Sequence, residues 1–241
     1  MNELLLEMKG LTIRTSERLL VEDVSFQVLG GRVTALVGAS GSGKSLSARA
    51  AMGVLDVNPG LVAGELRYPG LDPKRDWFDG VRGVGMSAQR RLQKESVAVR
   101  GGYVTYSPQS ASSALNPGRT IGHQLEKAIA RRENQPADLG VAIAEVLQEV
   151  GLPPRAAFAV PGELSGGMAQ RAALAIAIAP QPKVMIADEP ETGLDPVLRR
   201  VVTELMLEVA KTHGVGLLLI THNMDTVERV ADVVVRIGGE A

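Results

Sequence analysis

The feature that most constrains the fold is a glycine-rich octapeptide at residues 38–45, Gly-Ala-Ser-Gly-Ser-Gly-Lys-Ser. Gly38 and Gly43 are separated by four residues, and Lys44 and Ser45 follow them, which is the pattern of a phosphate-binding loop. The preceding run, residues 33–37, is apolar and rich in β-branched residues, as in a buried strand. Residues 46–52 contain no proline, so a helix can begin at the loop. The sequence therefore predicts a strand–loop–helix unit, the context that the motif requires.

This loop is a candidate anion site. Its glycines let the backbone curl so that several N–H groups point inward, and the helix N-terminus adds a partial positive charge. We expect Lys44 to reach β- and γ-phosphates and the Ser45 hydroxyl to ligate Mg²⁺. The candidate phosphate-binding residues are Gly38, Ala39, Ser40, Gly41, Ser42, Gly43, Lys44 and Ser45. A chance Gly/Ser-rich turn is the alternative, and the agreement of loop, Lys-Ser pair and flanking elements disfavours it.

The composition is that of an ordinary globular chain and excludes several classes of function. The chain has 241 residues, 45% hydrophobic and 22% charged, enough for one large domain or two small ones. Its formal net charge of −1 lacks the positive excess that is typical of nucleic-acid-binding proteins. The absence of cysteine excludes disulfides, thiolate metal sites and a cysteine nucleophile. Residues 1–9 show no basic leader, and no run of about 18 apolar residues occurs, so we expect neither a signal peptide nor a membrane span.

Apolar runs of strand length recur along the chain. Near the N-terminus they alternate with polar residues, as exposed antiparallel strands do, at residues 4–8, 11–13, 19–21 and 24–28. Further on they are more uniformly apolar and separated by helical segments, at residues 33–37, 103–106, 184–187, 216–220 and 233–237. Apolar strands that alternate with helices predict a mostly parallel sheet covered on both faces.

Helical patterns fall into two groups. Residues 124–132 and 137–150, the latter followed by Gly151, indicate a helical insertion between about 110 and 162. Residues 166–179 form an apolar helix that ends at Pro180 and should be buried. Asp195 is expected to cap a last long helix, which ends at Gly214 and has an apolar stripe of Val197, Leu198, Val201, Val202, Leu205, Met206 and Val209. The predicted fold is α/β, a P-loop NTPase core with a mostly parallel sheet, an N-terminal antiparallel β subdomain and an inserted α-helical subdomain.

The stretch from 54 to 102 gives a weaker signal. Residues 62–68 can form another alternating strand, and residues 82–100 carry several basic and few apolar side chains. We interpret the basic stretch as a solvated helix face or loop, and contact with anionic lipid or a partner is the alternative.

Two adjacent acids follow the apolar run at 184–187. Asp188 is expected at the carboxyl end of a buried strand, where ligands collect in open α/β sheets, and its carboxylate can hold Mg²⁺. Glu189 should point to a different side, where it can polarise a water as the general base for attack on a γ-phosphate. Two solvated acids at a strand end are the alternative, which the upstream phosphate loop disfavours.

A second glycine-rich turn opens the helix predicted from residue 166. Ser165 can cap that helix, and Gly166 and Gly167 leave N–H groups free behind it, so the turn is a second candidate anion site. With Gln170-Arg171 following, Ser165-Gly166-Gly167 resembles the signature motif of the ATP-binding-cassette (ABC) transporters. Over residues 3–237 the chain resembles the nucleotide-binding subunit of that family. The resemblance implies binding and hydrolysis of ATP with Mg²⁺ by two subunits paired head to tail.

The resemblance also implies roles for three further residues. Gln109 matches the Q-loop glutamine, which senses Mg²⁺ and the attacking water. Asp195, at the end of Thr-Gly-Leu-Asp, matches the D-loop across the dimer interface. His222 matches the switch histidine, which contacts the γ-phosphate; taken alone, a histidine after a strand is more often structural.

A finer resemblance indicates the peptide/nickel import group. It rests on residues 111–117 and 120–122, on Met168 after the signature glycines and on Leu46 after the phosphate loop. That group implies oligopeptides, dipeptides, nickel or metallophore complexes as cargo.

Three departures from the family pattern are visible. Residues 14–18 offer no aromatic side chain to stack on adenine, so we expect aliphatic or arginine contacts there. Glu191 stands where threonine is common. The sequence ends at Ala241, whereas importers of this group usually continue with further strands and a C-terminal substrate-site extension.

We therefore expect an ATP-binding core formed by residues 1–109 and 163–241 and a permease-contacting helical subdomain at 110–162. The partners implied are a second ATPase subunit, identical or different, transmembrane permease subunits and a solute-binding protein, with no nucleic acid, at the cytoplasmic face of the membrane. Two alternatives stay open: a non-transport ABC ATPase, and a regulatory nucleotide-binding module that does not hydrolyse ATP.

Overall fold

Two β-sheets form the framework of this computed structural model, which describes residues 3–109 and 114–238. The antiparallel sheet has the order β2-β1-β4 and is built from β1 (Leu4–Thr15), β2 (Leu19–Leu29) and β4 (Pro59–Arg67). The parallel sheet has the order β5-β6-β7-β3-β8. Its strands are β3 (Val33–Val37), β5 (Val104–Ser107), β6 (Val184–Asp188), β7 (Gly216–Ile220) and β8 (Val233–Arg236).

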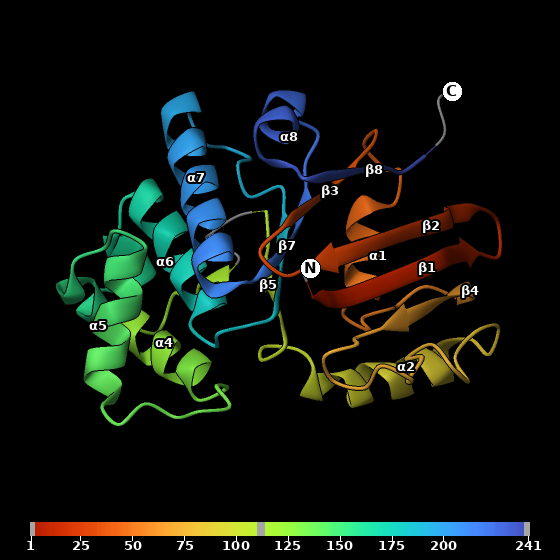
Figure 1. The fold of residues 1–241 in the computed structure, drawn as a ribbon, viewed down its shortest axis with the longest axis horizontal. Coiled ribbons are helices and arrows are strands. Elements are labelled where there is room, and N and C mark those ends of the chain that lie inside the picture. Colours follow the sequence, from red (N-terminus) through yellow and green to blue (C-terminus); the bar gives the residue numbers. More distant parts are fainter. Residues whose placement is uncertain (1–2, 110–113, 239–241) are drawn as a thin grey trace.

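The helices gather around these sheets. They are α1 (Lys44–Ala50), α2 (Met86–Glu95), α4 (Ile121–Ile129), α5 (Leu139–Glu149), α6 (Gly166–Ile178), α7 (Pro196–His213) and α8 (Met224–Val230). Short 3₁₀ turns lie at Ser96–Ala98, Pro154–Phe158 and Pro161–Glu163. Figure 1 shows α4–α7 at one end of the molecule, the antiparallel sheet with α2 at the other, and the parallel sheet between them. In the described part of the chain no helix is long and apolar enough to cross a bilayer.

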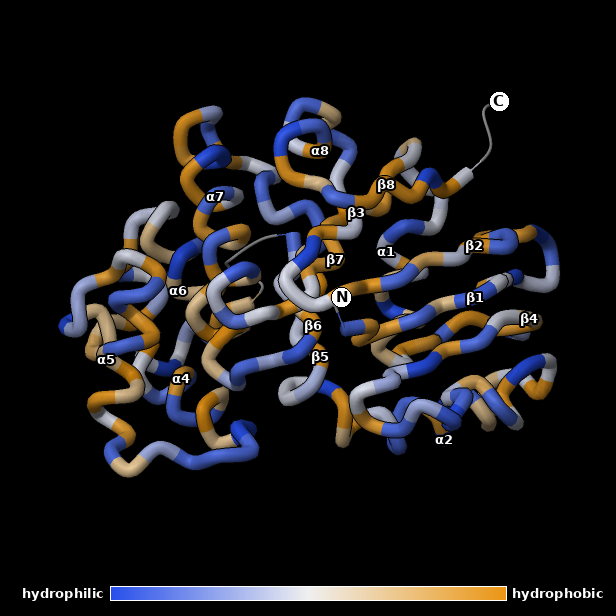
Figure 2. The backbone as a smooth tube through the Cα atoms, in the orientation of Figure 1, coloured by the Kyte–Doolittle hydropathy of each residue, from blue (hydrophilic) through white to orange (hydrophobic). Residues whose placement is uncertain are grey.

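The parallel sheet lies between two large apolar cores, because successive side chains of a strand point to opposite faces, and a small third cluster joins β3 to α8. Ile186 and Leu218 pack with the antiparallel sheet, α1 and α2, whereas Met185 and Leu217 pack with α4–α7. The central strands are accordingly apolar along their length in Figure 2. The predicted fold class is thus confirmed, whereas the division into 1–109 with 163–241 and 110–162 stays a prediction.

Three details of the sheets differ from the expectation. The first two apolar segments form one strand, β1, and the interruption between them is a register shift between Met8 and Leu11 that contains Gly10 at a φ of 58°. Because β1 lies between two neighbours and packs against the core, residues 5–8 are all buried and do not alternate with exposed positions. In the parallel sheet, Val233 and Val234 of the edge strand β8 are 43% and 44% exposed, so this sheet is not covered on both faces at that edge.

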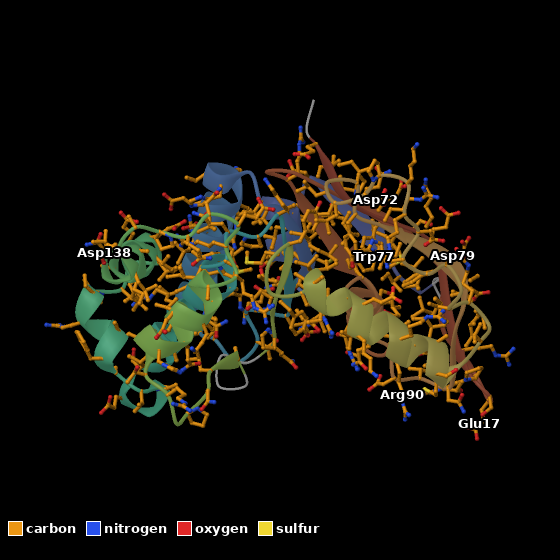
Figure 3. The ribbon with its side chains drawn as sticks, turned by 90° about the horizontal axis from the view of Figure 1, so that it is seen from below. Glu17, Asp72, Trp77, Asp79, Arg90 and Asp138 are labelled. Carbon is orange, nitrogen blue, oxygen red and sulfur yellow. The ribbon has the colours of Figure 1, made fainter. Side chains whose placement is uncertain are left out.

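The helices confirm some of the patterns and correct others. In α7, Val202, Met206 and Val209 are buried as expected, but Val197 and Val201 are 75% and 45% exposed. The basic stretch contains α2, in which Leu92 is buried and Arg90 is exposed. Figure 3 shows Arg90 pointing away from the molecule. The stretch therefore forms a helix with an exposed basic face, as the first interpretation expects, and whether solvent, lipid or a partner covers that face stays untested.

Candidate nucleotide site

The candidate residues converge at the carboxyl ends of the parallel strands. The loop at 38–45 follows β3, Gln109 follows β5, Asp188 ends β6 and His222 follows β7. In a parallel sheet these ends lie at one edge, which is where ligands bind in open α/β folds. The fold thus brings together residues that are far apart in the sequence.

The loop backbone depends on glycine at two positions. A Cβ atom at Gly38 would lie 2.2 Å from the Ile237 carbonyl oxygen. Gly43 has a φ of +96°, and a Cβ atom there would lie 2.7 Å from the Leu20 carbonyl oxygen. Neither position can accept a side chain without a shift of the surrounding backbone.

Gly43→Ala is therefore expected to lower the free energy of unfolding more than Gly41→Ala. Both glycines have positive φ, and the left-handed conformation costs an L-residue about 1–2 kcal/mol. A Cβ atom at Gly41 meets nothing within 4 Å, whereas one at Gly43 meets backbone, so only Gly43→Ala should add at least ~1 kcal/mol of crowding. Denaturant unfolding of the two variants measures this difference. Equal losses in the free energy of unfolding would show that a methyl group at Gly43 is not crowded by the surrounding backbone.

Lys44 lies over the loop that precedes it. Its side chain is buried, and its ammonium group donates hydrogen bonds to the carbonyl oxygens of Gly38 and Ala39, each at 2.8 Å. The loop thus holds a positive charge beside the N-terminus of α1, which favours the binding of an anion.

Ser45 and Asp188 form the second part of the site. The Ser45 hydroxyl donates to Asp188 Oδ1 at 3.1 Å, although 143 residues separate the two in sequence. Mg²⁺ is typically held by one or two protein oxygens together with phosphate and water, and this pair fits that pattern. Within residues 3–109 and 114–238, no group of three or more His, Cys, Asp or Glu side chains could hold a metal by itself. Gln109, the third expected metal contact, donates a hydrogen bond to Glu189 Oε2 at 3.1 Å, and its contact with Mg²⁺ stays a prediction.

Tyr106 is a site residue that the sequence did not reveal. Its hydroxyl donates to Asp188 Oδ2 at 2.8 Å, so both carboxylate oxygens of Asp188 have a partner. Burial and then the charge of Asp188 raise the pKa of Tyr106 above its usual range, which keeps the phenol protonated as a donor. The residue lies in a predicted strand, where a tyrosine is most simply interpreted as a core side chain.

Glu189 is held by side chains from three strand ends. Its Oε2 accepts from Gln109 Nε2 and Thr192 Oγ1, both at 3.1 Å, and its Oε1 lies 3.2 Å from His222 Nδ1. Its backbone has a φ of +47°, an uncommon conformation for a non-glycine residue and one that clusters at functional sites. Asp188 and Glu189 therefore face different partners, as expected, and a fixed carboxylate beside a phosphate site can accept a proton from water.

The second glycine turn lies on the surface. Ser165 caps α6 by accepting a hydrogen bond from the Met168 N–H at 3.3 Å, and Ser165 and Gly166 are exposed. Buried Gln170 donates to the Pro190 carbonyl oxygen at 2.9 Å and so ties α6 to the segment after Glu189. Among the described residues, no hydrogen bond joins this turn to the loop at 38–45.

Asp195 has a clear structural role. Its Oδ1 accepts from the N–H groups of Val197 and Leu198 at 3.0 and 2.9 Å, which caps α7 as the sequence predicted. Asp195 is also exposed, so a second subunit can contact it, and that contact across a dimer interface stays a prediction. Residues 110–113, part of the stretch that indicates the peptide/nickel group, lie outside the described residues.

Comparison with known proteins gives the family. The family model described as "ABC transporter" matches residues 21–192. The dipeptide transport ATP-binding protein DppD of Escherichia coli K12 is 36% identical over 215 residues, which cover 88% of this chain and 61% of DppD. The nickel import ATP-binding protein NikD of Pseudomonas putida KT2440 is 35% identical, over 96% of this chain and 83% of NikD. The chain therefore spans about three fifths of the length of DppD.

Solved structures agree in fold. One titled "Structure of ATP binding subunit of ABC transporter" has a TM-score of 0.72 and 27% identity, and covers 97% of this chain and 85% of that one. The cbiO1 structure from Clostridium perfringens has a TM-score of 0.74 over 98% of this chain and 85% of that chain, at 21% identity. By the match over residues 21–192 and the identity with these relatives, the chain belongs to the ABC transporter family.

Proposed function

We propose that this chain binds ATP with Mg²⁺ and hydrolyses it as the motor subunit of an importer for peptides, nickel or metallophore complexes. The observation that carries the proposal is the position of Glu189, fixed by Gln109, Thr192 and His222 at the sheet edge that also holds the 38–45 loop. The printed names of DppD and NikD, dipeptide transport and nickel import, support the cargo class.

The residues divide the chemistry between them. The 38–45 loop and Lys44 bind the β- and γ-phosphates, and Ser45 with Asp188 would hold Mg²⁺, which neutralises charge on the phosphates. Glu189 takes a proton from the water whose oxygen attacks the γ-phosphorus, and ADP leaves. Gln109 and His222 orient that carboxylate and the attacked phosphate.

The second glycine turn serves a second subunit. Ser165 and Gly166 are exposed and Gly167 is half-buried, and in the described part of the chain none of them is hydrogen-bonded to the loop at 38–45. They can therefore close on ATP held by the loop of another ATPase subunit. Asp195 would lie in the same interface. Binding of ATP would then close the pair and hydrolysis would reopen it.

The permease would dock beside the helical insertion. A cavity of about 780 Å³ lies between β5, α4 and α6, and its lining includes Tyr106. Of the described residues that line it, four are basic, Arg100, Arg119, Lys127 and Arg131, and none is acidic. A cytoplasmic segment of a transmembrane partner can contact this surface, which would place the chain at the inner face of the membrane.

One experiment separates this proposal from its rivals. We expect the chain, expressed with a tag in its own cells, to co-purify with integral membrane proteins and to release phosphate from ATP in that complex. Recovery with ribosomes or DNA would favour a non-transport ABC ATPase instead. ATP binding without phosphate release in the intact complex would favour a regulatory module.

A further inference from the structure

Glu191 carries the most heavily hydrogen-bonded buried carboxylate near the site. Its side chain is 7% exposed. Its Oε1 accepts from Thr221 Oγ1 at 2.6 Å, and its Oε2 accepts from Thr226 Oγ1 at 2.8 Å and from Asn223 Nδ2 at 3.5 Å. A buried carboxylate is costly unless such donors compensate it, so this set of contacts is a specific arrangement rather than surface packing.

The three donors share one location, the turn that carries His222. Thr221 immediately precedes His222, Asn223 immediately follows it, and Thr226 lies in the first turn of α8. Asn223 in turn caps α8 by accepting from the N–H groups of Asp225 and Thr226 at 3.1 and 3.4 Å. The carboxylate therefore fixes the histidine turn on both sides of the histidine.

Glu191 also faces the helix that follows the 192–195 segment. Arg199 Nε in α7 lies 3.8 Å from Glu191 Oε2. That nitrogen is buried and has no hydrogen-bond partner among the described residues, so Glu191 is the anion that offsets its charge. A cavity of about 520 Å³ is lined by Thr192 and Gly193, by Arg199 and by residues 222–225 of the histidine turn, and Glu191 lies in its wall.

We propose that Glu191 is a positioning residue that locks the His222 turn onto the segment between Glu189 and Asp195. The inference rests on the proposed function, because it assigns His222 and Glu189 to one reaction. Glu191 touches neither of them through its carboxylate. It acts through Thr221, Asn223 and Thr226, and so holds His222 Nδ1 at 3.2 Å from Glu189 Oε1.

The first readout is the imidazole of His222 in the intact chain without nucleotide. The chain has three histidines, His123, His213 and His222, so nuclear magnetic resonance of the ring nuclei gives few signals to assign. In Glu191→Ala we expect the His222 signals to shift and broaden while those of His123 and His213 stay in place. Unchanged His222 signals in the folded variant would overturn the proposal, whether or not the chain hydrolyses ATP.

The second readout is hydrolysis. We expect Glu191→Ala to lower kcat about tenfold or more. The dissociation constant for ATP is measured separately in Glu189→Gln, with and without Glu191→Ala, and the two values should agree within about twofold. Glu191→Gln, which keeps an acceptor oxygen in place, should recover kcat to within about threefold. A kcat that is unchanged in Glu191→Ala would contradict the positioning role, and a parent chain without hydrolysis would instead reject the proposed function.

A matched control separates positioning from loss of stability. Glu7 is also buried, at 8% exposure, and accepts from Gln27 Nε2 at 2.7 Å, but it lies in the antiparallel sheet. Glu7→Ala should lower the melting temperature and leave kcat and the His222 signals unchanged. If Glu191→Ala fails to fold, Thr226→Val removes one donor with little change in volume, and the same shift of His222 is expected. An equal loss of kcat in Glu7→Ala would reduce Glu191 to a structural role and overturn the proposal.

Discussion

Glu189→Gln is expected to bind Mg-ATP and pair with a second subunit while turning over at least ~10²-fold more slowly than the parent. The amide keeps the size of the side chain and can still meet Gln109, Thr192 and His222, but it cannot accept the proton of the attacking water. Phosphate release under saturating ATP measures the loss. ATP retention on a filter shows that binding survives.

The control for Glu189→Gln is Asp225→Asn, an exposed acid in the first turn of α8, near His222 but without a hydrogen bond to Glu189. It removes one negative charge from the same surface and should leave turnover within about twofold, because exposed charges interact weakly. Near-normal turnover in Glu189→Gln would reject Glu189 as the general base.

Ser165→Asp is expected to abolish most hydrolysis, by about 10²-fold, without unfolding the chain. Aspartate caps helices as well as serine does, so α6 should keep its N-terminus. The added negative charge would face the γ-phosphate held by the other subunit, and like charges about 4 Å apart repel by up to ~4 kcal/mol near a protein surface. Phosphate release and the melting temperature, measured together, separate the two effects.

Ser165→Asn is the matched variant, because asparagine also caps the helix and carries no charge. It should retain more than about a tenth of the activity. If Ser165→Asp hydrolyses ATP as fast as Ser165→Asn, the turn does not approach a phosphate, and the assignment of residues 165–167 to a partner's nucleotide is wrong.

The features that the sequence predicts well are those set by local pattern. The loop at 38–45 is defined by its glycines, α7 by Asp195 at its cap and Gly214 at its end, and β6 by the apolar run at 184–187. Each depends on residues close together in the chain, so no knowledge of the tertiary structure is needed.

The features that the sequence misses depend on contacts between distant segments. The sequence alone suggests that Tyr106 is a core residue, whereas in the structure its hydroxyl donates a hydrogen bond to Asp188. Thr192 donates a hydrogen bond to Glu189 because the chain turns after β6. Glu191 stands out in the sequence only as an unusual residue at its position, and the role proposed for it depends on hydrogen-bond donors that lie 30–35 residues further along the chain. Single-sequence patterns cannot give such pairings, because they depend on side-chain direction in the folded state.

Calorimetric titration of the chain with nucleotide in Mg²⁺ tests the central claim, that the loop at 38–45 binds a triphosphate, most directly. ATP should bind at least ~10-fold more tightly than AMP, because Lys44 and the loop are expected to contact the β- and γ-phosphates. Lys44→Ala should remove that preference while the chain stays folded. AMP binding as tight as ATP binding, or an unchanged affinity for ATP in Lys44→Ala, would show that the loop at 38–45 does not bind the triphosphate.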